Sequence, residues 1–292
     1  MRYQRQLVWL IPVIFVLTLF AASMGLFYQP QGESYEFTNH RGETVTIHGR
    51  GLYAYDTVSM AAQQQGNDLI ALVVGLPLLA VSTWLAFRGS LRGRLLLTGT
   101  LAFLLYTYMS MSMLTSFNAL FLVYVALFTL SLHAFILSML SFDLKTLPER
   151  FSERLPRSWI AALLFFVGSF LLIAWLGRII PPVLSGTTPA LENTTTLVIQ
   201  AMDLGLVVPL VILAAVLLLR DNAWGYLLTS VALMKGVTIG LAVSSMAVNM
   251  ALQGVPEELG IMVPFLAITV LNLIMGVLLL VNVEPAKTAA PA

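Results

Sequence analysis

Eight stretches of about 20 apolar residues constrain this chain more than any other feature. A helix needs about 20 apolar residues to cross a bilayer, and such stretches lie at residues 7–27, 68–87, 95–115, 119–141, 158–178, 198–219, 226–250 and 260–283. Charged residues make up 10% of the chain, whereas they reach about 25% in soluble globular proteins. We therefore expect an all-α fold, a polytopic transmembrane helix bundle of eight spans, forming a single integral membrane domain over residues 1–292.

The basic residues of the short loops predict the orientation of the bundle. Three of them, Arg41, Arg50 and Arg178, lie on or near one side of the spans. The other side carries Arg2, Arg5, Arg88, Arg92, Arg94, Lys145, Arg150, Arg154, Arg157, Arg220 and Lys287. Because cytoplasmic loops are enriched in Lys and Arg, we expect both termini in the cytoplasm and residues 28–67 and 179–197 outside.

The first span has an alternative interpretation as a secretory signal peptide. Arg2 and Arg5 precede an apolar run, and Ala21-Ala22-Ser23 resembles a weak cleavage site. The apolar run continues through Leu26 and Phe27, which favours a retained anchor.

Residues 28–67 are expected to form an extracytoplasmic excursion that contains a small β-hairpin. Residues 35–38 and 44–47 alternate in polarity around a turn at residues 39–42. Asp56 is the expected N-cap of a helix that runs outside the membrane into the second span, with residues 63–65 on its exposed part. The excursion is either a lid over an outward-facing cavity or a solvated segment packed on the bundle.

A shift of 132 residues superimposes two segments of the chain. It pairs a proline, an arginine and a glycine in each: Pro77 with Pro209, Arg88 with Arg220, and Gly93 with Gly225. Both segments hold a proline-containing span, a tight turn and the next span. This suggests two parallel four-span halves, residues 1–141 and 158–283, related by an axis along the membrane normal, as in some transporters. Chance similarity between leucine-rich spans is the alternative.

Asp203 and Lys235 are the charged residues that lie well within the predicted spans. A charge at bilayer depth costs about 2.5–3.5 kcal/mol on insertion scales, so it usually faces a cavity or a partner. The two residues differ in depth by about 8–10 Å at 1.5 Å per residue. We expect a direct or water-bridged pair, with Arg178 as the rival partner of Asp203. Alternatively, the pair only locks the helix register.

Polar side chains are biased toward the outer halves of the spans and suggest a cavity that opens outward, lined by the third, fourth, sixth and seventh spans. Asp203 would be its acidic group and Lys235 its floor. The predicted ligand-binding residues are Asp203, Lys235, Tyr106, Tyr108, Tyr124, Asn118, Arg178 and Asn249. His133 is a further candidate, whereas Trp9, Trp84, Trp175 and Trp224 lie near span ends and are interpreted as interface anchors.

Five short strings resemble those of a family of bacterial polytopic membrane proteins with about eight spans and no known activity. They are Tyr55-Asp56-Thr57-Val58, Gly89-Ser90-Leu91-Arg92-Gly93-Arg94, Leu105-Tyr106-Thr107-Tyr108, Asp203-Leu204-Gly205 and Trp224-Gly225-Tyr226-Leu227-Leu228. The resemblance would cover most of the chain. It implies a multi-pass protein of the bacterial inner (cytoplasmic) membrane and assigns no catalytic residue.

The leading functional hypothesis is a non-enzymatic protein that binds or transports a small molecule or lipid through the cavity. No common nucleotide-binding or hydrolase motif occurs, and no ligand spacing predicts a metal or another cofactor. One alternative is an intramembrane enzyme that acts on a lipid-linked substrate through His133 and Asp203. Another is a sensor or assembly partner that acts through residues 28–67. The expected partners are the lipid bilayer and a small-molecule or lipid ligand; nothing indicates nucleic acid or a particular protein.

Overall fold

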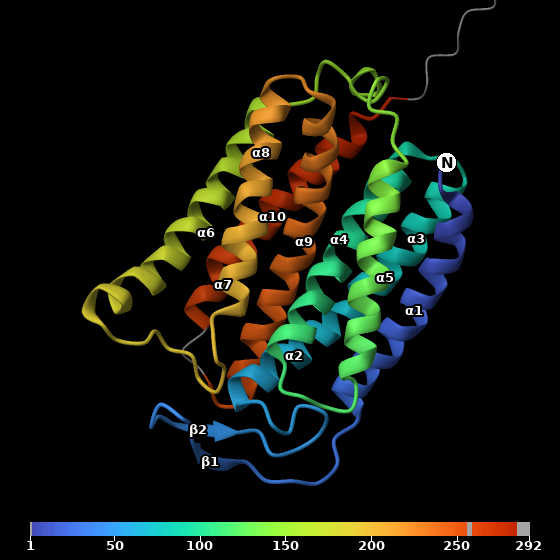
Figure 1. Cartoon of the computed structure of the whole chain (residues 1–292). Helices are drawn as coiled ribbons and strands as arrows, with labels where there is room; N and C mark the ends of the chain where they lie inside the picture. Colours follow the sequence, from blue (N-terminus) through green and yellow to red (C-terminus); the bar gives the residue numbers. More distant parts are fainter. Residues whose placement is uncertain (1, 256–258, 285–292) are drawn as a thin grey trace, which may run out of the picture.

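The fold is a bundle of long helices with a small sheet at one end (Figure 1). The structure is a computed structural model, which describes residues 2–255 and 259–284. Within these residues, eight helices are long and apolar enough to cross a membrane, which confirms the predicted helical membrane bundle. Two of the eight spans are divided into three successive segments. The segments are α1 (Gln4–Phe27), α2 (Val58–Ile70), η1 (Ala71–Gly75), α3 (Leu76–Phe87), α4 (Leu91–Leu114), α5 (Phe121–Leu140), η2 (Pro148–Arg150), α6 (Arg157–Ser185), α7 (Val198–Met202), η3 (Asp203–Val207), α8 (Val208–Leu219), α9 (Ala223–Leu252) and α10 (Leu259–Val281).

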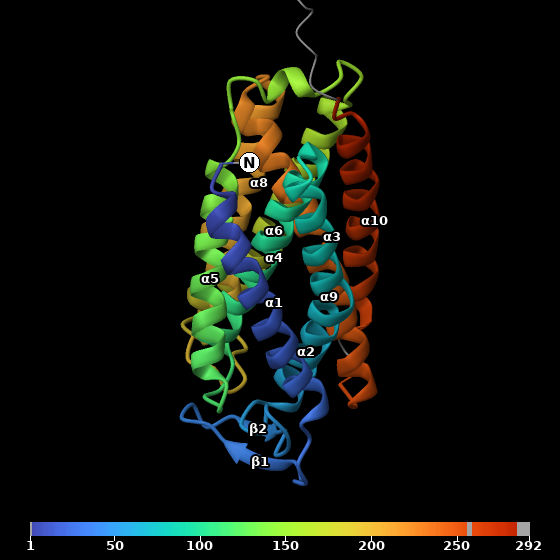
Figure 2. The same cartoon turned by 90° about the vertical axis from the view of Figure 1, so that its right-hand side faces the viewer.

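The start of α1 and the end of α10 lie at one end of the bundle, and the hairpin lies at the other (Figures 1 and 2). We call these the terminal end and the hairpin end. At the terminal end, the α5–α6 loop pairs with the chain after α10: the backbone N–H of Ser152 donates to the carbonyl of Asn282 at 2.8 Å. The even number of spans thus returns the chain to its starting side, and the assignment of that side to the cytoplasm stays a prediction.

The hairpin has the predicted bounds and is fixed to the second half of the chain. Strands β1 (Tyr35–Thr38) and β2 (Thr44–Ile47) pair antiparallel. In the turn, Asn39 Nδ2 donates to the carbonyl of Glu192 at 2.8 Å, and Arg41 Nη1 donates to the carbonyl of Thr194 at 3.0 Å. The hairpin therefore packs on the α6–α7 loop.

Helix α2 begins one residue later than expected and enters the bundle earlier. Thr57, and not Asp56, caps it, because Thr57 Oγ1 accepts from the backbone N–H of Met60 at 3.2 Å. Asp56 instead accepts from the backbone N–H of Ser116 in the α4–α5 loop at 2.9 Å. Gln64 is buried, so the prediction that residues 63–65 are exposed is wrong.

Both spans that contain Pro77 and Pro209 carry a π-helical turn of five residues directly before the next helix. Proline has no N–H and its ring clashes with the carbonyl four residues earlier, and a π turn inserts the extra residue that relieves this clash. The two π turns are related by the 132-residue shift, as are the helices α3 and α8 and the capping residues Ser90 and Asn222. The sequence repeat thus extends to element bounds, while the duplication itself stays a prediction.

Helices α4 and α9 pack against each other at the centre and separate two apolar cores. The order α3–α4–α5 in the first half matches α8–α9–α10 in the second, since neighbours are in contact in both. One core joins α1, α2, α4 and α5. The other joins α6, α8, α9 and α10 with the start of α4. Asp203 and the polar residues of α2 therefore lie in different parts of the bundle.

Candidate functional site

Asp203 is buried at the start of the π turn η3 and is held by two aromatic donors. Tyr106 Oη of α4 donates to Asp203 Oδ1 at 2.7 Å, and Trp175 Nε1 of α6 donates to Asp203 Oδ2 at 2.9 Å. Asp203 is 7% exposed. The sequence interpretation of Trp175 as an interface anchor is therefore wrong, because its indole N–H binds the carboxylate.

Lys235 forms no direct ion pair with Asp203 among the described residues. Its ammonium group lies 3.7 Å from the centre of the Tyr106 ring, in a cation–π contact. The ion pairs among the described residues are Arg41 with Glu43 and Arg157 with Asp221. Tyr106 thus lies between the amine and the acid and contacts both.

The rival partner Arg178 lies away from Asp203. It is exposed, and its Nη2 donates to the carbonyl of Ala190 at 2.7 Å in the α6–α7 loop. It therefore supports the loop that the hairpin contacts and does not neutralise the buried acid.

Tyr108 and Tyr124 belong to the core that joins α1, α2, α4 and α5, and so do not line a chamber with Asp203. Residues two apart on a helix point about 200° apart, so α4 directs Tyr106 and Tyr108 to opposite sides. Tyr108 stacks on Tyr124 of α5, with ring centres 6.4 Å apart. Asn118 lies beside Tyr124 at the start of α5, where its Oδ1 accepts from the backbone N–H of Leu120 at 2.9 Å.

A second buried acid, Asp68, was missed because the sequence places it at the predicted edge of a span. Helix α2 begins ten residues before it, and Asp68 is 1% exposed. Tyr53 Oη donates to Asp68 Oδ2 at 2.5 Å. The length of the apolar run gave no signal for this site, since the polar first turns of α2 pack against α9 and α1.

His133 is not assembled into an acid–base site. It is exposed on α5, and its Nδ1 lies 2.7 Å from the carbonyl of Thr129 on the same helix. The arrangement that the enzyme hypothesis requires, with His133 beside Asp203, is not formed.

A cavity with a volume of about 1090 Å³ lies at the hairpin end, between α2 and α9. We call it the groove. Of the predicted ligand-binding residues, Asn249 lines it, whereas Asp203, Lys235 and the three tyrosines do not. The groove shares the seventh span, α9, with the cavity predicted along the third, fourth, sixth and seventh spans, and its other main wall is α2. Its lining residues are Leu26, Gln29, Pro30, Gln31, Gly32, Glu33, Arg50, Gln65, Gly66, Leu69, Ile70, Leu241, Ser244, Ser245, Val248, Asn249, Leu252 and Leu266.

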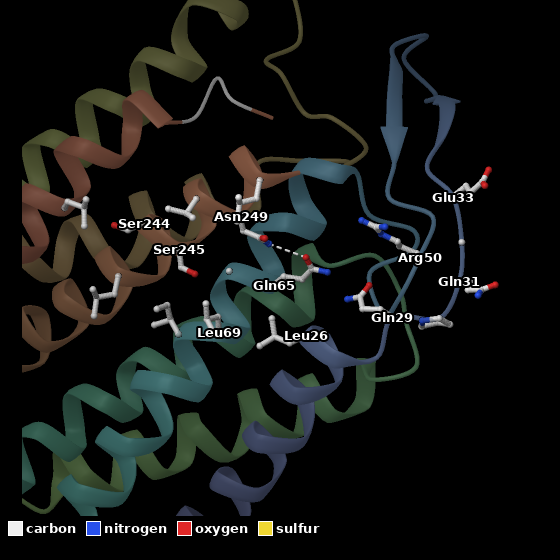
Figure 3. Close-up of a pocket in the computed structure, with 18 residues that line it drawn as sticks. Leu26, Gln29, Gln31, Glu33, Arg50, Gln65, Leu69, Ser244, Ser245 and Asn249 are labelled. Carbon is white, nitrogen blue, oxygen red and sulfur yellow. Dashed lines mark hydrogen bonds between the residues drawn. The ribbon is translucent and has the colours of Figure 1, made fainter. Parts of the chain in front are cut away.

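The two main walls of the groove are joined by amide hydrogen bonds and by a close backbone contact. Asn249 Nδ2 donates to the carbonyl of Ala62 at 2.7 Å and to Gln65 Oε1 at 3.2 Å (Figure 3). Gln253 Nε2 donates to the same Gln65 oxygen at 2.7 Å. At Gly66, a Cβ would lie 2.7 Å from the backbone of Met246, so glycine lets α2 and α9 meet here.

The groove is apolar along the helices and polar at its mouth. Leu69 on α2 faces Ser244 and Ser245 on α9, and the mouth is formed by residues 29–33 and Arg50 (Figure 3). Arg50 is exposed and has no ion pair among the described residues. A ligand in this groove would meet hydrocarbon walls and an arginine at the opening.

Asp56 and His48, both in the hairpin segment, have shifted pKa values. Burial raises the pKa of Asp56 to about 6, against the lowering effect of the hydrogen bonds from Ser116. Burial lowers the pKa of His48, and the positive charge of Arg50 acts in the same direction. His48 Nε2 and Asp56 Oδ2 are buried without a hydrogen-bond partner among the described residues. Burial in the folded segment therefore shifts both groups toward their neutral forms relative to their ordinary pKa values.

Comparisons with known protein families, with curated proteins and with solved structures found no match to this chain. The resemblance to a bacterial family of eight-span proteins therefore stays a prediction. The functional argument rests on the chemistry of the groove and of the buried polar groups.

Proposed function

We propose that this protein binds an amphiphile, a lipid or a lipid-like small molecule, in the groove between α2 and α9. The observation that carries the proposal is a cavity of about 1090 Å³ with apolar helical walls and a polar mouth. Ligand sites in proteins are concave, mostly apolar and equipped with a few polar groups that orient the ligand. In this proposal the protein lies in the bacterial inner membrane with the hairpin end outside, so the ligand comes from the outer leaflet.

The length of the groove matches one leaflet of a bilayer. Its lining on α9 extends from Leu241 to Leu252, which is about 16 Å at 1.5 Å per residue. The hydrocarbon core of a bilayer is about 30 Å thick, so one leaflet contributes about half of this. An acyl chain that enters from one leaflet would therefore lie along the whole groove without crossing the membrane midplane.

The mouth of the groove suits a polar head group with an anionic part. A guanidinium group binds phosphate or carboxylate through paired hydrogen bonds, and Arg50 is available for this at the opening. Gln29 and Gln31 add amide donors and acceptors beside it. Transport of the bound molecule across the membrane is a further possibility, but binding is the part of the hypothesis that the groove supports.

The test is to fill the groove and measure bound lipid. Leu69→Trp places a large side chain on a groove wall, because Leu69 lines the groove and is 44% exposed. Val81→Trp is the matched control, since Val81 lies on the same span, is 53% exposed and does not line the groove. Both variants and the unmodified protein are purified in detergent, and lipid that survives delipidation is quantified by mass spectrometry.

We expect the unmodified protein and Val81→Trp to retain about one lipid or lipid-like molecule per chain, and Leu69→Trp to lose at least nine-tenths of it. Arg50→Ala should reduce retention of an anionic phospholipid more than that of a zwitterionic one. Equal retention in Leu69→Trp and Val81→Trp would contradict the proposal.

A further inference from the structure

Asp68 is a buried carboxyl group that the groove does not use. It projects from α2 away from the groove residues and is 1% exposed. Tyr53 Oη donates to Asp68 Oδ2 at 2.5 Å. On α1, a Cβ at Gly25 would lie 1.8 Å from the same oxygen and 2.7 Å from the Tyr53 hydroxyl. The backbone of α1 therefore closes over the carboxyl group and leaves it enclosed by protein.

Three buried hydroxyl groups on helices that pack in this half of the bundle form no hydrogen bond among the described residues. They are Thr18 Oγ1 of α1, Tyr108 Oη of α4 and Tyr124 Oη of α5. All three residues are at most 1% exposed. The Tyr124 phenol lies near Tyr53, and both it and the Tyr108 phenol lie within the field of Asp68. Buried polar groups in native proteins are nearly always paired with protein, water or an ion, so the free hydroxyls point to an occupant.

The charge of Asp68 has no counterpart among the residues that the structure describes. No described Lys, Arg or His forms an ion pair with it, and the titratable groups that face it, Tyr53, Tyr108 and Tyr124, are neutral phenols. Asp203 differs, because it has two donors and the ammonium group of Lys235 on the other side of Tyr106. An unpaired buried carboxylate is strongly disfavoured, and such a group takes up a proton or pairs with a cation.

We propose that Asp68 and the phenol groups of Tyr53, Tyr108 and Tyr124 form a buried site for a single positive charge, supplied as a proton on Asp68 or as a sodium ion. A proton converts the carboxylate to a neutral acid that donates to a free phenol oxygen. A sodium ion is a hard cation and is held by oxygen atoms, which are the only polar atoms of these four side chains. The site is separate from the groove, so it does not depend on the proposed function.

The two sources of charge are distinguished by infrared spectroscopy of the full chain with isotope-labelled aspartate. At pH 8 an ordinary aspartate is ionised, whereas a protonated Asp68 shows the C=O band of a neutral carboxylic acid. Spectra are recorded in sodium chloride and in choline chloride at equal ionic strength. A band in both salts identifies a proton. A sodium site is identified if the band appears only in choline chloride, or if the melting temperature is lower in choline chloride than in sodium chloride.

Three variants assign the signal. Asp68→Asn, a neutral isostere of the protonated acid, should remove the band and the sodium effect, whereas Asp203→Asn should leave both unchanged. Tyr53→Phe should shift the band, because it removes the hydrogen bond to Asp68, and it assigns the signal if Asp68→Asn does not fold. The absence of the band in both salts, together with equal stability in sodium and choline, would overturn the proposal.

Discussion

The ammonium group of Lys235 lies 3.7 Å from the centre of the Tyr106 ring, while the hydroxyl group of the same ring donates to Asp203 at 2.7 Å. The side chain of Tyr106 therefore makes a hydrogen bond to the acid with its hydroxyl group and a cation–π contact with the amine through the face of its ring. This arrangement connects α4, η3 and α9, and Trp175 adds α6 through the second carboxylate oxygen. The buried charges thus hold the second half of the bundle to the central helix α4.

Removal of the Tyr106 hydroxyl should weaken this connection without removing the cation–π contact. Tyr106→Phe leaves Asp203 Oδ1 without its donor, and a buried unsatisfied group costs about 1–3 kcal/mol. Tyr106→Leu should lower the free energy of unfolding by about 1–2 kcal/mol more, because the ring that contacts Lys235 is lost. Unfolding in mixed detergent micelles measures both. Tyr28→Phe is the control, since Tyr28 is 50% exposed; a similar loss in it would contradict the prediction.

The hairpin segment should become less stable as the pH rises from about 4 to 6. Burial raises the pKa of Asp56 from 3.8 to about 6, so the folded segment holds this proton more tightly than the unfolded one. The stabilisation is complete below pH 3.8 and is lost as the pH passes 6, with an upper value of about 3 kcal/mol. Hydrogen exchange of residues 44–60 measures it. Asp56→Asn should remove this part of the pH dependence.

His48 should contribute to the pH dependence in the opposite direction. Its pKa is lowered by burial, so the folded segment disfavours the protonated imidazole. Stability from this group is present above its ordinary pKa of 6.5 and falls as the pH drops through its lowered folded value. Hydrogen exchange in a His48→Gln background should therefore show a steeper loss of stability with rising pH. An unchanged profile would contradict the assignment.

The close contact between α2 and α9 should make Gly66 sensitive to a single methyl group. In Gly66→Ala the new Cβ would lie 2.7 Å from the Met246 backbone, so the helices must separate, at a cost of about 1–3 kcal/mol. Gly177→Ala on α6 meets nothing within 4 Å and should be neutral or stabilising by up to about 1 kcal/mol. Thermal unfolding compares the two. Equal melting temperatures would show that the helices do not meet at Gly66.

Arg41 should control the proteolytic sensitivity of the α6–α7 loop. Its guanidinium group donates to the carbonyls of Glu192 and Thr194, and the planar fork of arginine makes both bonds at once. Arg41→Ala should raise the rate of cleavage within residues 186–197 several-fold at fixed protease. Arg154→Ala, at the terminal end, is the control and should leave the rate unchanged. A loop that is cleaved equally fast in both variants would show that the hairpin does not hold it.

The existence of the eight spans and the bounds of the hairpin follow from local patterns. A run of about 20 apolar residues specifies a span wherever it lies, and alternation around the turn at residues 39–42 specifies the paired strands. The prolines also act locally, which is why Pro77 and Pro209 each follow a π turn. The early start of α2 could not be predicted in the same way, since Gln64 and Asp68 are buried by segments remote in sequence.

The grouping of polar residues into sites was beyond the sequence. In a soluble helix the apolar face identifies the core, but a membrane helix is apolar toward lipid and toward protein alike, so its rotation about its own axis leaves little trace. Tyr106 and Tyr108 therefore looked equivalent, although one binds Asp203 and the other faces Asp68. Ser245, Asn249 and Leu252 share one face of α9, and this spacing was the signal that could have indicated the groove.

The sequence by itself determined how many helices are long and apolar enough to cross a membrane, where the hairpin forms and which residues are polar within the spans, because each of these depends on the polarity of neighbouring residues along the chain. Tertiary structure alone decided that Trp175 and Tyr106 satisfy Asp203, that Asp68 is enclosed without a counter-charge among the described residues, and that the groove opens between α2 and α9. These features depend on the rotation and depth of one helix against another, which packing between distant segments sets.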